Sequence, residues 1–215
     1  MEKQFKKASG ISLLSGAILA TLTMAMHPIG GSLTEIAGKK GIFMFSHALA
    51  ILSIPFIAFG FWGLATALAT KGRVSFLAFS VTCIGLIAVM IAGTVNGFVL
   101  PMFASNYAGS TVDGSVLQAI RDYGWLLGLS MDYFFIVALS LAILLWSVIL
   151  IVVGQLSRWL GYYGLLIVVV TLLGLLMKFN FTTVLGFGLF IFSLVSWIII
   201  AAILLIITPS KNTSL

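Results

Sequence analysis

Residues 183–208 read TVLGFGLFIFSLVSWIIIAAILLIIT, and no charged side chain interrupts them. A helix needs about 20 consecutive apolar residues to cross the hydrocarbon core of a bilayer, so this stretch is long enough to span a membrane. Five similar stretches precede it. The six predicted spans lie near residues 10–29, 43–69, 75–101, 123–153, 160–178 and 183–208. All are continuously apolar rather than alternating, which favours helices over the strands of a membrane barrel.

The composition predicts the same class of protein. Of the 215 residues, 61% are hydrophobic and only 7% are charged, whereas soluble domains carry roughly a quarter charged residues. We therefore expect an all-α, polytopic transmembrane bundle of six helices that forms a single domain over residues 1–215. The net charge of +6 does not indicate a nucleic-acid partner. The basic residues stand singly or in small groups beside apolar runs, as the flanks of membrane spans do.

The basic residues also predict the orientation in the membrane. With a cytoplasmic N-terminus, seven of them would face the cytoplasm and four the outside, the direction that the positive-inside rule requires. The inner set is Lys3, Lys6, Lys7, Lys71, Arg73, Arg158 and Lys211, and the outer set is Lys39, Lys40, Arg121 and Lys178. We expect both termini in the cytoplasm, because an even number of spans returns the chain to its starting side.

Two longer connections, residues 30–42 and 102–122, face the predicted outer side. In the second, Asp113 or Ser115 could cap a short helix, which we expect to lie in the interface plane and lead into the fourth span. Two glycine pairs, Gly93 with Gly97 and Gly124 with Gly128, have the small-xxx-small spacing that lets membrane helices approach closely.

Two histidines are the first candidates for chemistry. His27 and His47 fall at the same predicted depth on either side of one helix hairpin, so their imidazoles could be neighbours. Histidine is the commonest metal ligand and titrates near neutral pH. Such a pair could ligate haem, copper or zinc, or pass a proton. Alternatively, each ring could simply form a hydrogen bond with a carbonyl or a lipid headgroup at the interface.

Asp132 and Asn96 lie close to the same depth. A carboxylate inside a membrane must pair, bind a cation, line water or stay protonated, unless it makes a purely structural hydrogen bond. Asn96 could contact a ligand or form a hydrogen bond between helices. Met44 and Met131 fall nearby, and thioethers together with imidazoles favour Cu(I), although methionine is also a general apolar filler.

Four short segments carry a resemblance to known proteins. HPIGG at residues 27–31, SHALAILSIP at 46–55, GFWGL at 60–64 and AVMIAGTVNGF at 88–98 resemble stretches of uncharacterised bacterial six-span integral membrane proteins. The resemblance covers about the first hundred residues. It implies location in a bacterial inner (plasma) membrane, and it brings no assigned activity and no catalytic residue.

The sequence therefore predicts a small integral membrane protein with a polar pocket in the outer leaflet. His27, His47, Asn96 and Asp132 would line it, and the ligand would be a metal, a haem or a small polar molecule within a membrane assembly. One alternative is an accessory subunit without a site, which would pack its fifth and sixth spans against partner helices. Another is a transporter or a lipid-acting enzyme. The scarcity of ionisable residues in the inner half argues against an ion-coupled transporter.

Overall fold

Every element in the described part of the chain is helical. The computed structural model describes residues 3–69, 73–154 and 156–208. In chain order the helices are α1 (Lys3–Ala25), α2 (Leu33–Gly38), α3 (Lys40–Leu68), α4 (Val74–Thr94), the π-helical turn η2 (Val95–Val99), α5 (Leu100–Tyr107), α6 (Gly114–Val153), α7 (Arg158–Leu176) and α8 (Val184–Ile207). Six helices, with α4, η2 and α5 counted as one, are long and apolar enough to cross a membrane. The prediction of an all-α, six-span protein is confirmed.

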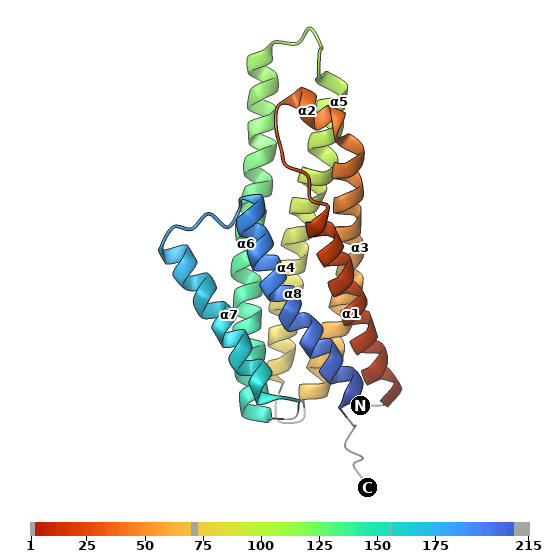
Figure 1. Ribbon diagram of the computed structural model, residues 1–215, viewed down its shortest axis with the longest axis vertical. Coiled ribbons are helices and arrows are strands. Elements are labelled where there is room, and N and C mark those ends of the chain that lie inside the picture. The colour runs from red at the N-terminus through yellow and green to blue at the C-terminus, as the bar shows by residue number, and fades with distance from the viewer. Residues whose placement is uncertain (1–2, 70–72, 155, 209–215) are drawn as a thin grey trace.

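The first and last described residues lie at the same end of the bundle (Figure 1). Lys6 Nζ donates a hydrogen bond to the carbonyl oxygen of Thr208 at 2.8 Å, which ties the beginning of α1 to the end of α8. We call this end the terminal end and the opposite one the distal end. Lys71 and Lys211, which belong to the predicted inner set of basic residues, fall outside the described residues.

The prediction of a short helix in the interface plane is wrong. Residues 114–122 instead form the first turns of α6, which runs unbroken to Val153. Asp113 caps this helix by accepting a hydrogen bond from the backbone N–H of Ser115 at 2.7 Å. No proline follows to break the helix, so it continues through the polar residues into the apolar ones. The helix that precedes α6 is also longer than predicted, because the third span extends to Tyr107 rather than ending near residue 101.

Three helical segments project beyond the others at the distal end. At 1.5 Å per residue, the 40 residues of α6 measure about 60 Å and the 19 residues of α7 about 28 Å. The hydrocarbon core is about 30 Å thick, so α7 matches it and α6 exceeds it. In Figure 1, α5, α2 and the first turns of α6 rise above the ends of α7 and α8. Ile36 of α2 is buried there against Phe43 and Ala104.

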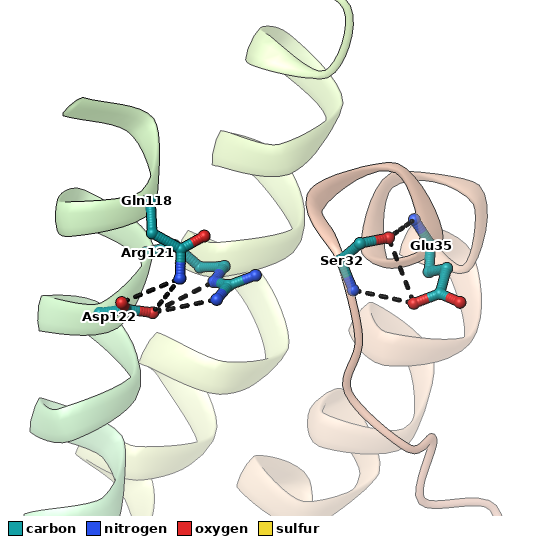
Figure 2. A network of polar contacts seen from close by, with 5 residues as sticks. All are labelled: Ser32, Glu35, Gln118, Arg121 and Asp122. Atoms are coloured by element: carbon teal, nitrogen blue, oxygen red, sulfur yellow. Dashed lines mark hydrogen bonds and ion pairs between the residues drawn. The ribbon is translucent and has the colours of Figure 1, made fainter. Parts of the chain in front are cut away.

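The charged side chains of this projecting end bond to their own neighbours (Figure 2). Glu35 accepts a hydrogen bond from the backbone N–H of Ser32 at 2.8 Å, which caps α2 and holds the pKa of the Glu35 carboxyl below its usual value. On α6, Asp122 accepts from Gln118 Nε2 at 2.9 Å and pairs with Arg121 at 3.1 Å. Glu35 and Asp122 therefore stabilise local helix structure.

Close packing through glycines holds α1 between α3 and α8. A Cβ at Gly60 of α3 would stand 2.8 Å from the Cα of Leu13, and a Cβ at Gly10 of α1 would stand 2.9 Å from the carbonyl oxygen of Ala202. Only glycine permits helix backbones to approach this closely. On the other side of the bundle, α6 packs against α4 and α7, while α8 packs mainly against α1. A cavity lies between these two groups of helices.

Candidate functional site: a cavity at the centre of the bundle

The cavity has a volume of about 160 Å³, and every described helix except α7 contributes to its lining, together with the connections that follow α1 and precede α8. All four residues of the predicted polar pocket line it: His27, His47, Asn96 and Asp132. They come from four different segments of the chain. Most of the other lining residues are aliphatic or aromatic, so the cavity combines a few polar groups with apolar walls.

The two histidines are neighbours, as their equal depth predicted. Their ring centroids lie 5.0 Å apart, with the ring planes inclined by 58°. His47 Nδ1 lies 2.8 Å from the carbonyl oxygen of Phe43, and His27 Nδ1 lies 3.0 Å from the carbonyl oxygen of Pro28. A carbonyl oxygen can only accept, so each Nδ1 carries the hydrogen and each Nε2 keeps a lone pair. Burial lowers the pKa of His27, which lies beyond the end of α1, and so favours the neutral ring.

Asn96 sits in the π-helical turn η2, a few residues before Pro101. Proline removes a backbone N–H and crowds the carbonyl four residues earlier, and the wider π turn accommodates this. The side chain of Asn96 lies against Gly128 of α6, where a Cβ would clash with its amide. Its Oδ1 is buried without a hydrogen-bond partner, and no other described residue bonds to the amide. The predicted hydrogen bond between helices is therefore not formed within the described chain.

The glycine pairs noted in the sequence make room for these polar groups. A Cβ at Gly97 would clash with the side chain of His47, and a Cβ at Gly124 would stand 2.7 Å from Leu100 Cδ2. Gly93 allows the His47 ring an ordinary contact, 3.9 Å from its Cβ position. Gly97, Gly124 and Gly128 therefore each lie in close contact with a side chain of a neighbouring helical segment, whereas Gly93 makes only ordinary contacts; the contact at Gly97 lets the His47 side chain pack against the third span.

Asp132 of α6 also lines the cavity. No described residue forms a hydrogen bond with its carboxyl, so the purely structural hydrogen bond considered from the sequence is not made within the described chain. The nearby hydroxyl of Ser130 donates to the carbonyl oxygen of Leu126. Nearer the distal end, the Trp125 ring lies beside Gly30, 3.7 Å from that residue's Cβ position. The segment after α1 and the start of the apolar part of α6 thus meet at the cavity's distal end.

Three aromatic side chains pack together on the terminal side of the cavity. Phe61 stacks on Trp146 with ring centroids 5.7 Å apart and on Trp197 at 6.3 Å, and all three are fully buried. Trp146 Nε1 donates a hydrogen bond to Thr82 Oγ1 at 3.1 Å, and Trp197 Nε1 donates to the carbonyl oxygen of Leu160 at 3.0 Å. We call Phe61, Trp146 and Trp197 the aromatic floor. They do not line the cavity, and they fill the core beyond its terminal end.

The structure does not support the methionines and the haem predicted from the sequence. Met44 and Met131 do not line the cavity, whereas Met24, one helical turn before His27, does. Among residues 3–69, 73–154 and 156–208, no three or more His, Cys, Asp or Glu side chains group in a way that could hold a metal ion. A cavity of 150 Å³ is known to hold one benzene ring. The larger macrocycle of haem does not fit within the similar volume found here.

Comparison with known proteins adds no family to this description. No family model, no curated protein and no solved structure matches the chain. The resemblance of the first hundred residues to bacterial six-span proteins gains no support from these comparisons. The six candidate spans are the only ground on which the chain is placed among multi-pass membrane proteins.

Proposed function

We propose that the protein is a membrane binding protein that holds the polar group of a small ligand among His27, His47, Asn96 and Asp132. The observation that carries this proposal is the buried, unpartnered Oδ1 of Asn96, a residue that lines the cavity together with three ionisable residues. Buried polar atoms normally have partners, so an unpartnered one on a residue that lines a cavity suggests a partner that comes from outside the chain. An accessory subunit without a site would have no need of these polar groups.

The position of the cavity supports binding from one side of the membrane. The aromatic floor separates the cavity from the terminal end, which favours a pocket over a conduit. Among the described basic residues, five belong to the predicted inner set and four to the outer set. By the positive-inside rule the terminal end would be cytoplasmic and the cavity would lie in the outer leaflet, in an inner (plasma) membrane if the host is a bacterium.

A metal ion is the second candidate, and the geometry of the histidines favours it. Both rings present Nε2 as a ligand while a carbonyl fixes Nδ1, as in many metal sites. With metal–nitrogen bonds of about 2 Å, two imidazoles on a tetrahedral ion would have centroids roughly 5 Å apart. The observed 5.0 Å fits this arrangement. Met24 would add a soft ligand, which favours Cu(I).

Analysis of the purified protein tests both candidates. The organic extract is examined by mass spectrometry and the metal content by elemental analysis, for the wild type and for Asp132→Asn. We expect one bound species near equimolar amount in the wild type and much less in the variant. Ser130→Ala serves as the control, because this exposed hydroxyl on the same helix bonds only to its own backbone. Equal ligand content in all three proteins would refute a site at Asp132.

A further inference from the structure

The cavity is long in the direction of the helices. Its lining extends from Phe43 to Ile57 on α3, from Leu86 to Leu100 along α4 to α5, from Trp125 to Leu139 on α6 and from Val184 to Ile198 on α8. Each pair is separated by 14 positions, and at 1.5 Å per residue each helix lines the cavity over about 21 Å. A volume of about 160 Å³ is close to the 150 Å³ that holds one benzene ring, so it has room for one hydrocarbon chain of about six carbons along part of this length.

The two ends of this slot differ in chemistry. His27, His47 and Asn96 lie in its distal half and Asp132 lies near its middle. The half that approaches the aromatic floor contains Ser53 and Phe135 and is otherwise lined mainly by aliphatic side chains: Ile57, Leu86, Leu139, Leu194, Val195 and Ile198. A ligand that matches both halves has a polar head and one apolar chain.

The polar groups also restrict the chemistry of the head. The two imidazole Nε2 atoms and the Asp132 carboxyl provide acceptors, while the Asn96 amide provides both an acceptor and a donor. No Lys or Arg of the described chain lines the cavity. A phosphate or carboxylate head would therefore meet mostly acceptors and no compensating cation. A hydroxyl or amine head would donate to them.

We infer that the ligand is a single-chain amphiphile with a hydrogen-bond-donating head, whose chain lies along the slot with its end near the aromatic floor. This inference rests on the proposed function, because the head occupies the same polar site. It excludes two-chain phospholipids, whose second chain the slot cannot take. It also excludes haem and other fused rings.

A photoreactive chain tests the inference directly. The protein in phosphatidylcholine nanodiscs is irradiated with a six-carbon primary alcohol that carries a diazirine at its far end, and labelled residues are mapped by mass spectrometry. We expect labels at Leu139, Leu194 or Ile198, and competition by 1-hexanol and hexylamine but not by hexanoate. Labels confined to lipid-facing side chains, or equal competition by hexanoate, would overturn the inference without recourse to any variant.

A matched pair of variants on α8 provides the second arm. Leu194→Trp fills the slot, whereas Leu189→Trp adds the same ring on the lipid-facing side, where Leu189 is 53% exposed. We expect slot labelling to fall at least tenfold in the first variant and to remain in the second; equal labelling in both would refute the slot.

A third variant, Asn96→Leu, distinguishes the two proposals. Labelling that is retained in Asn96→Leu would support the slot for the chain and refute the site for the head. A ligand found in the organic extract without any labelling of the slot would support the head site and refute the slot.

Discussion

Replacing Asn96 by leucine should stabilise the empty protein and abolish ligand binding. The substitution removes a half-buried amide whose buried Oδ1 has no partner, and it puts an apolar side chain of the same branched shape in the same place. A buried polar group without a partner costs about 1–3 kcal/mol, so the free energy of unfolding should rise by about that amount. A residue that stabilised the bundle by bonding between helices would show the opposite sign.

The assay is reversible unfolding in mild detergent, with the wild type first stripped of bound molecules. Asn106→Leu is the control, because Asn106 is exposed on α5 and its replacement should change stability by no more than about 0.5 kcal/mol. Ligand added back should raise the unfolding midpoint of the wild type and of the control, but not that of Asn96→Leu. A loss of more than about 1 kcal/mol in Asn96→Leu alone would show that the amide is structural and would remove the main support for the site.

Three further outcomes are expected. Gly60→Ala should lower the free energy of unfolding by about 1–3 kcal/mol, because the added Cβ would press on Leu13 of α1. Gly41→Ala should raise the free energy of unfolding by up to about 1 kcal/mol, because its added Cβ would have nothing within 4 Å. Unfolding measurements on both variants show whether the two changes have opposite signs. Asp132→Asn should keep the fold and weaken ligand affinity tenfold or more, as measured by titration, since a charged acceptor is lost; wild-type affinity would exclude Asp132 from the site. A reporter fused after the last residue should be active only in the cytoplasm, and periplasmic activity would reverse the orientation inferred from the basic residues.

The spans could be predicted because each apolar run is a local property, but their ends could not. The polar residues Gln118, Arg121 and Asp122 suggested a connection, and they are in fact helical turns of α6 outside the apolar part. Hydropathy reports where lipid can surround a helix, not where its hydrogen bonding stops. The N-terminus of α6 is marked by Asp113. The sequence identifies this residue as a capping residue, but as the cap of a separate short helix.

The sequence predicted the depth of the polar residues that line the cavity, but not the direction in which each side chain points about its helix axis. Equal depth brought together His27 and His47, since a hairpin fixes the height of both residues. Met131 could have been excluded from the sequence, because residues adjacent in a helix face different directions and Asp132 already pointed inward. Met44, by contrast, is three residues before His47, a spacing that places both on similar faces. Only the packing of α3 shows that it does not reach the cavity.

The energetics of the cavity argue that it is retained for a reason. Cavities cost about 24 cal/mol per Å³ in unfilled cores, so about 160 Å³ would cost up to roughly 4 kcal/mol when empty. The unpartnered amide of Asn96 adds about 1–3 kcal/mol at the same place. A few larger aliphatic side chains would remove both costs, and the same chain fills its terminal half completely with Phe61, Trp146 and Trp197. Since the bundle packs densely where it can, a defect that costs this much beside four convergent polar groups is better explained by a ligand that fills it than by imperfect packing.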